Sequence, residues 1–206
     1  MTTPSRELEK LRQEQLKGDP VIREGILTAM LECCGELGYR RVSVERVYRR
    51  YGGYRSQFYR YFASKEECYL AAYELEIERL SERLVASGKG TCQDSLEGAL
   101  SRLADFAKEH PLKARALFVE VHIAGGLALT KRWEVFERLS HALDSACRKT
   151  GSREIPPPLT SEFMVSAVDQ ALLSALVSNR PEEFAETVPR LTELIHTAYR
   201  GEAASR

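Results

Sequence analysis

A short basic stretch that is rich in tyrosine, residues 38–65, holds the side chains of this sequence best suited to binding chemistry. It contains eight arginine or lysine residues and one acid, Glu45, so its formal charge is +7, whereas the whole chain has 30 basic and 30 acidic residues. Six of the nine tyrosines lie in the same stretch. Arginine and lysine neutralise phosphates, and polar side chains of this kind also reach base edges. We therefore expect this stretch to contact a polyanion.

Two short helices around a glycine turn are predicted within the stretch. Ser43 is a capping residue for the first helix, and Gly52-Gly53 ends it because glycine takes a left-handed backbone without strain. The second helix begins near Tyr54, and Ser64 with Glu67 three residues later forms a capping box that starts a third. The apolar positions of the first two helices have helical spacing: Val44, Val47, Tyr48, Tyr51, Phe58 and Phe62. Helix, tight turn and helix is the DNA-binding helix-turn-helix, whose second helix enters the major groove.

Residues 43–67 resemble the N-terminal helix-turn-helix of the TetR/AcrR-type transcriptional regulators. Their sequence is SVERVYRRYGGYRSQFYRYFASKEE, and the most specific part is FYRYFASKE at residues 58–66. The turn differs from the usual family pattern of glycine, apolar residue and serine or threonine, because it reads Gly52, Gly53, Tyr54. Tyr48 and Tyr51 stand where the family usually has small residues. The alternative is that the basic run is only a solvated face and the aromatic stripe only core.

The resemblance and the helical positions together define a candidate DNA-binding set. Arg55 and Gln57 lie in the first turn of the second helix, where side chains reach base edges, so we expect them to read sequence. Tyr59 and Lys65 match family positions that clamp the DNA backbone, and with Ser43 they are expected to hold phosphates. The full candidate set is Ser43, Arg46, Tyr54, Arg55, Ser56, Gln57, Tyr59, Arg60, Tyr61 and Lys65.

The chain divides into three predicted parts: residues 1–19 as an N-terminal extension, 20–66 as the helix-turn-helix domain, and 67–206 as a helical domain. Asp19-Pro20 predicts a helix start, and Gly38 predicts its end. This helix should pack behind the helix-turn-helix through a buried stripe of Ile22, Ile26, Ala29, Met30, Cys33 and Leu37.

The rest of the sequence is predicted to be helical, with breaks at residues 87–90, at His110-Pro111, at Gly125-Gly126 and at the three prolines 156–158. No segment alternates like a strand. The predicted fold is therefore all-α: an N-terminal three-helix helix-turn-helix domain followed by a helical-bundle domain for ligand binding and dimerisation.

A homodimer is expected because each helix-turn-helix reads half of a two-fold DNA site. By the family resemblance, the last two helices, roughly residues 160–200, would form a four-helix bundle with a second copy; the alternative is that their apolar stripes pack within one chain. The family also builds a cavity for a small apolar or amphipathic effector, and the candidate lining residues here are Phe106, Phe118, His122, Trp133, Phe136 and Asp169. His122 shares a helix face with Phe118, so a satisfied core histidine is the alternative. No metal-ligand spacing is present.

Composition indicates a globular protein of one or two domains, with 206 residues, 43% of them apolar and 29% charged. No apolar run approaches a membrane span, no secretion signal is recognised, and the five cysteines form no CxxC pair, so a cytoplasmic protein with reduced thiols is expected. We find no nucleophile–base pair, phosphate loop or cofactor motif, which argues against an enzyme.

The predicted function is a DNA-binding transcriptional regulator, a homodimeric repressor that a small-molecule effector releases from its operator. The alternative is a helical effector-binding or scaffolding protein that has lost operator binding through its altered turn. The sequence leaves open the operator, the effector, the regulated genes, repression against activation, and the role of residues 1–19.

Overall fold

The structure is a computed structural model that describes residues 19–85, 92–149 and 160–200. Every element in these ranges is helical, which confirms the predicted all-α fold. The elements are α2 (Pro20–Leu37), the 3₁₀ turn η1 (Tyr39–Arg41), α3 (Val44–Tyr51), α4 (Arg55–Tyr61), α5 (Lys65–Val85), α6 (Cys92–Glu109), α7 (Pro111–Phe118), the 3₁₀ turn η2 (Glu120–His122), α8 (Gly126–Lys149), α9 (Thr160–Val177) and α10 (Pro181–Arg200). None of the described helices is long and apolar enough to span a membrane.

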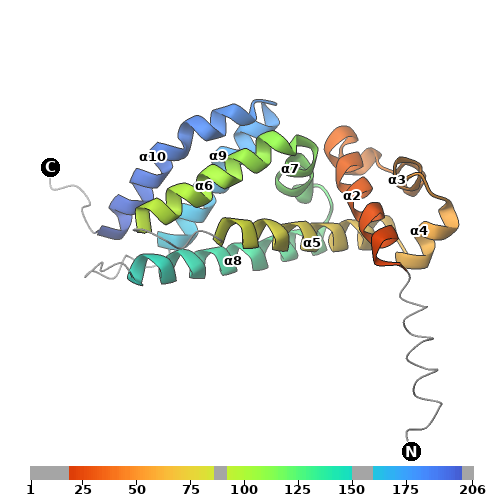
Figure 1. Cartoon of the computed structure of the whole chain (residues 1–206), viewed down its shortest axis with the longest axis horizontal. Helices are drawn as coiled ribbons and strands as arrows, with labels where there is room; N and C mark the ends of the chain where they lie inside the picture. The colour runs from red at the N-terminus through yellow and green to blue at the C-terminus, as the bar shows by residue number, and fades with distance from the viewer. Residues whose placement is uncertain (1–18, 86–91, 150–159, 201–206) are drawn as a thin grey trace, which may run out of the picture.

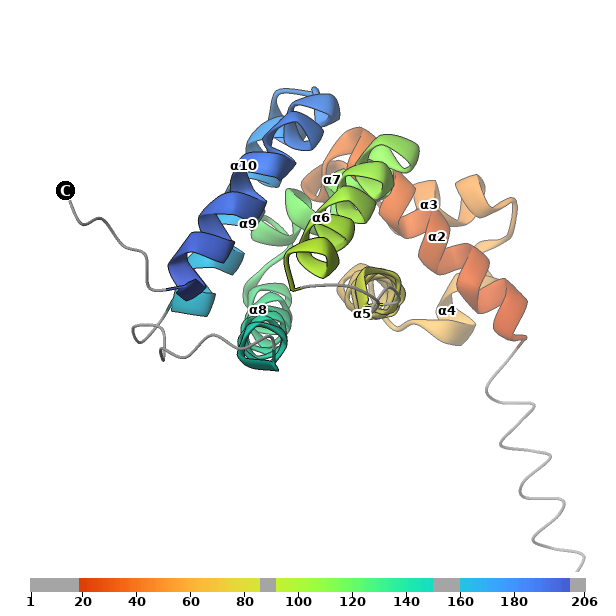
Figure 2. The same ribbon diagram turned by 60° about the vertical axis from the view of Figure 1, so that its left-hand side comes forward.

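The helices form a small group at one end of the molecule and a larger bundle beside it (Figure 1). Helices α2, α3 and α4 make the small group, and α5 leads from it along the bundle with α8 running next to it (Figures 1 and 2). Helix α10 packs against α6 and α9, while α7 packs against both α2 and α9. The short α7 therefore joins the small group to the bundle, and α5 crosses the domain boundary that the sequence predicts at residue 66.

The sequence correctly predicts both ends of α2 from local capping residues. The Asp19 carboxylate caps the helix by accepting the Val21 backbone N–H at 2.8 Å, and Gly38, with φ of +81°, ends it. The buried face of α2 is wider than the predicted stripe, because Leu27, Leu31 and Cys34 are also buried. The reason is tertiary: α3, α5 and α7 all pack against this one helix.

The predicted glycine turn is confirmed. Gly52 has a left-handed backbone with φ of +84°, and the Gly53 N–H bonds the Tyr48 carbonyl at 2.9 Å, which closes α3. The predicted Ser64 cap at the start of α5 is also present, but the Glu67 carboxylate accepts the N–H of Ala63, the residue before the cap, rather than that of Ser64 as in a capping box. The Glu67 N–H bonds the Ser64 hydroxyl at 3.1 Å, and the Ala63 N–H bonds the Glu67 carboxylate at 2.6 Å.

The structure corrects the predicted path of the chain around residues 117–126, and several other predictions lie outside the described residues. The single helix expected through Leu117 and His122 is instead α7 followed by η2, and the chain then turns at Gly125, whose φ is +116°. Gly126 begins α8 rather than ending the preceding helix. The breaks predicted at residues 87–90 and 156–158, and nearly all of the N-terminal extension, lie outside the described residues.

The apolar stripes of α9 and α10 pack largely within one chain. Phe184, Val188 and Ile195 on α10 are 4% exposed or less, as are Leu172 and Ala175 on α9. The stripes that suggested a dimer in the sequence therefore belong mainly to the core of the monomer. Large apolar side chains that remain exposed on these two helices are Phe163, Val177 and Leu194.

Candidate nucleic-acid interface

Helix α4 is anchored by one buried aromatic residue and presents its other side chains to solvent. Phe58 is fully buried and packs edge-to-face against the Tyr59 ring and at a tilt against the Phe62 ring, whereas Tyr54, just before the helix, is 75% exposed. The remaining exposed positions on this helix are Arg55, Ser56, Tyr59 and Arg60. The candidate recognition residues therefore lie together on one accessible helix, as predicted from the sequence.

Arg55 and Tyr59 form a pair on the exposed side of α4. The Arg55 guanidinium lies 5.5 Å from the centre of the Tyr59 ring, one helical turn away. Such a cation–π contact restricts the arginine side chain while leaving its N–H groups accessible. Arg55 is therefore held near the helix N-terminus in a position from which it can reach a base edge.

Gln57 has a structural contact that sequence reasoning missed. Its side-chain oxygen accepts the backbone N–H of Tyr54 at 2.9 Å and so helps to start α4. The carboxamide is half-buried. This hydrogen bond occupies one lone pair of the amide oxygen, so a base contact by Gln57 would use the other lone pair or the amide nitrogen, and its role in sequence readout stays a prediction.

Two of the three cations of α3, Arg46 and Arg49, are accessible to a phosphate. Arg46 is exposed, and its backbone N–H bonds the capping Ser43 hydroxyl at 3.4 Å. Arg49 is also exposed and pairs with Glu45 at 2.7 Å, a surface contact of small energy that a phosphate can replace.

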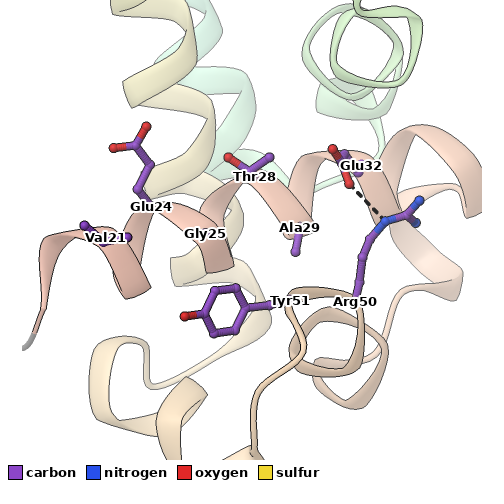
Figure 3. A pocket seen from close by; sticks show the side chains of 8 residues that line it. All are labelled: Val21, Glu24, Gly25, Thr28, Ala29, Glu32, Arg50 and Tyr51. Carbon is purple, nitrogen blue, oxygen red and sulfur yellow. Dashed lines mark hydrogen bonds and ion pairs between the residues drawn. The ribbon is translucent and has the colours of Figure 1, made fainter.

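Arg50 is the exception among the α3 cations, because it pairs with two carboxylates of α2. Its guanidinium lies 3.0 Å from the Glu32 carboxylate and also contacts Glu36, and the hydrogen bond that it donates to Glu36 raises the pKa of Arg50. Figure 3 shows this arginine reaching across to Glu32, beside a shallow pocket of about 550 Å³ between α2 and α3. Arg50 thus fastens α3 to α2.

Lys65 and Tyr61 also make contacts within the fold. The Lys65 ammonium donates to the carbonyls of Tyr39 and Val42 at 3.1 Å each, and it lies 4.2 Å from the centre of the Tyr39 ring. The Tyr61 hydroxyl accepts the Asp19 backbone N–H at 2.9 Å. Both residues stabilise the helix-turn-helix itself, and their contact with DNA stays a prediction.

None of the six residues predicted to line an effector cavity lines the pocket between α2 and α3 or the groove between α5 and α8, and their contact with an effector stays a prediction. Phe106 is buried, Phe118 and Phe136 are half-buried, and His122 is exposed. Trp133 is 62% exposed and donates its indole N–H to Glu137 at 3.1 Å, so in this chain it faces solvent rather than the interior. Helical spacing marked these positions as apolar but did not indicate which face of α8 the bundle would cover.

Asp169 belongs to an interior polar cluster between α8 and α9. It pairs with Arg132, and the two side chains are 13% and 16% exposed. Arg132 also stacks on the Phe136 ring at 4.3 Å. Burial raises the pKa of Asp169 against the opposing effect of Arg132. Partial burial of the largely exposed His122, together with the nearby Arg132, lowers the pKa of His122. Arg132 was missed in the sequence because nothing in the spacing links it to Asp169.

A groove of about 490 Å³ lies between α5 and α8. Its apolar side chains are Tyr73, Ile77 and Val135, and its charged rim includes Lys131, which pairs with Glu74 at 3.0 Å and Glu134 at 3.2 Å. None of the six predicted effector residues lines it. Among the described residues, no group of histidine, cysteine or carboxylate side chains has the arrangement of a metal site.

Comparison with known proteins agrees with this geometry. Residues 26–72 match the sequence profile of the family described as bacterial regulatory proteins, tetR family. The match runs from within α2 through α4 into α5, which confirms the predicted resemblance of this segment to the N-terminal domain of the family. No curated protein matches the chain.

Solved structures of regulators share the fold over most of their length. The fatty acid degradation regulator FadR from Bacillus halodurans has a TM-score of 0.76 at 16% identity, covering 87% of this chain and 96% of that one. FadR from Bacillus subtilis, solved with stearoyl-CoA, has a TM-score of 0.71 at 17% identity, with 84% and 97% covered. NemR from E. coli has a TM-score of 0.67 at 18% identity, with 84% and 95% covered. The chain therefore has the fold of TetR-type transcriptional regulators.

Proposed function

We propose that this protein is a homodimeric DNA-binding transcriptional regulator of the TetR type, acting as a repressor that a small molecule releases from its operator. The observation that carries the proposal is the exposed surface of α4, where Arg55 and Tyr59 stand beside Tyr54 on a helix anchored by the buried Phe58. This surface belongs to a helix-turn-helix with accessible cations on the preceding helix, the arrangement that major-groove binding requires.

In the proposed complex, α4 lies in the major groove and Arg55 donates to a base edge. A bidentate contact between arginine and guanine contributes about 1–3 kcal/mol of discrimination against the wrong base. The exposed Arg46 and Arg49 on α3 would lie towards the phosphates, which fix the register of the helix on the duplex. Affinity and sequence preference therefore come from different side chains of the same motif.

A second copy of the chain is proposed to pack on the outer face of α9 and α10. Phe163 and Val177 on α9 are 67% and 59% exposed, and Leu194 on α10 is 51% exposed. Exposed apolar side chains of this size on two adjacent helices are typical of a subunit interface. Dimerisation would place two α4 helices on the two halves of a symmetric site.

The proposed effector is a small apolar or amphipathic molecule that binds in the helical bundle. The groove between α5 and α8 supports this location, because α5 is continuous from the helix-turn-helix into the bundle. A ligand that favours one position of α5 over another changes DNA affinity by the same coupling free energy, typically about 1–3 kcal/mol.

Selection of DNA from a random pool by the full chain tests the proposed function. The expected result is enrichment of a two-fold symmetric site. A gel shift with the promoter beside the protein's own gene would then show whether that promoter contains the site. A pool that shows no enrichment, with a protein that is folded by circular dichroism, would contradict the proposal and favour the scaffolding alternative.

A further inference from the structure

One buried carboxylate lies where the helical bundle meets the helix-turn-helix. Glu120, in η2, is 3% exposed, and among the described residues only Glu76 is a comparably buried acid. Burial of a carboxylate is costly unless hydrogen bonds compensate for the lost water. The contacts of Glu120 therefore indicate what its burial achieves.

Glu120 binds the backbone of η1, 81 residues earlier in the chain. Its carboxylate accepts the Tyr39 N–H at 2.8 Å, and a Cβ placed on Gly38 would lie 3.5 Å and 3.8 Å from its two oxygens. The carboxylate thus packs directly on the turn that ends α2. A hydrogen bond of this type, between an ionised acceptor and a backbone N–H, is stronger than a neutral one.

Tyr39, whose N–H binds Glu120, is also held through its carbonyl by Lys65. The Tyr39 carbonyl accepts the Lys65 ammonium at 3.1 Å, and the Tyr39 ring packs edge-to-face against Tyr69 at 5.0 Å between ring centres. Tyr69 in turn donates its hydroxyl to the Ala116 carbonyl of α7 at 2.8 Å. Tyr39 is therefore fixed through its N–H by η2, through its carbonyl by the first residue of α5, and through its ring by α5.

The segment that Glu120 holds leads directly into the helix-turn-helix. Only Val42 and Ser43 separate η1 from α3, and Ser43 caps that helix. On the bundle side, η2 follows α7, which is tied to α9 by the hydrogen bond from Arg115 to the Leu176 carbonyl. Glu120 thus joins the part of the bundle that touches α9 to the start of α3.

We propose that Glu120 is a positioning residue for DNA binding: its hydrogen bond to Tyr39 fixes the start of α3, and hence the orientation of the helix-turn-helix, relative to the helical bundle. The proposal rests on the proposed DNA-binding function. Glu120 does not touch DNA. It acts through the Tyr39 backbone, and a movement of η2 would be transmitted to α3 by this bond.

The test compares the full-length variants Glu120→Ala and Glu120→Gln with Glu76→Ala. Glu120→Ala removes the acceptor, whereas Glu120→Gln keeps an oxygen of the same reach. Glu76→Ala is the matched control, because Glu76 is 7% exposed and contacts α7 through Lys113 but does not touch η1. The readouts are hydrogen exchange of the backbone amides of residues 39–43, affinity for the DNA that the wild type selects, and urea unfolding.

Glu120→Ala is expected to lower amide protection of residues 39–43 by about ten- to a hundred-fold, the range set by the loss of one charged hydrogen bond. It should also weaken DNA binding at temperatures where the protein remains folded. Glu120→Gln should keep most of the amide protection and most of the DNA affinity of the wild type. Glu76→Ala should reduce stability without changing protection of residues 39–43 or DNA affinity.

Three results would overturn the proposal: unchanged protection in Glu120→Ala, lost protection with unchanged DNA affinity, or the same losses in Glu76→Ala. If the wild type selects no DNA, the proposed function fails. The exchange arm needs no DNA, so it still shows whether Glu120 holds the start of α3.

Discussion

The contact between α2 and α7 gives the sharpest prediction about stability, because Gly35 lies directly against the backbone of α7. A Cβ placed on Gly35 would lie 2.0 Å from the Leu112 carbonyl oxygen and 2.6 Å from its carbonyl carbon. Ordinary contact begins near 3.4 Å, so Gly35→Ala would have to separate the two helices by about 1.4 Å. The obstructing atoms are backbone, which cannot rotate away as a side chain can.

Two opposing effects set the size of the change. Alanine favours a helix over glycine by up to about 1 kcal/mol, whereas overpacking a buried contact costs about 1–3 kcal/mol and occasionally more. Gly35 lies near the end of α2, where the helix preference counts least, and it is fully surrounded. We therefore expect Gly35→Ala to lower the free energy of unfolding by about 2 kcal/mol.

Gly98→Ala is the matched control for this substitution. Gly98 lies inside α6, and the atom nearest to an added Cβ is the end of the Arg102 side chain at 3.2 Å, which can move. This variant should be as stable as the wild type or up to about 1 kcal/mol more stable. Urea unfolding followed by circular dichroism, at one protein concentration for all variants, measures both changes. A Gly35→Ala protein as stable as the wild type would refute the close contact of α2 with α7.

Two further predictions concern charge and assembly. A dimer that neutralises about six to eight phosphates should show a slope of log affinity against log salt of about −5 to −7. Arg46→Ala should reduce the magnitude of this slope by about 1.8, because each of the two copies loses one phosphate contact. Arg50→Ala should leave the slope unchanged, because Arg50 is paired with Glu32 and Glu36. A slope near zero in a salt titration would mean that the basic face does not bind DNA. Phe163→Glu should give a monomer in size-exclusion chromatography with light scattering, since it places a charge at the proposed interface, and a dimer that persists would locate the interface elsewhere.

Much of the helix-turn-helix could be predicted from the sequence because short-range rules govern it. Asp19, Gly38 and Gly52 each set a helix end through contacts within a few residues, and the structure has these ends where the sequence predicts them. The same holds for the Ser64 side chain, which caps α5. The accessible face of α4 follows from one buried residue, Phe58, and helical periodicity.

The rest depends on partners that lie far away in the chain, which spacing does not indicate. Arg50 pairs with Glu32 and Glu36 of α2, and the Lys65 ammonium donates to the carbonyls of Tyr39 and Val42. Local spacing indicates neither set of partners. Trp133 shows the same limit, because its exposure depends on which face of α8 packs against the other helices of the bundle. The Glu120–Tyr39 bond joins residues 81 positions apart and has no local signal at all.

The most direct test of the central claim, that α4 reads DNA sequence through Arg55, is to measure how Arg55→Ala changes specific and nonspecific binding. Both affinities would be measured at the same salt concentration, on the selected site and on a scrambled duplex, with Lys108→Ala on α6 as a distant exposed control. The ratio of specific to nonspecific affinity should fall by about 5- to 150-fold in Arg55→Ala, equivalent to about 1–3 kcal/mol, with little change in nonspecific affinity. If both affinities fall by the same factor, Arg55 contacts only the backbone and the claim is contradicted.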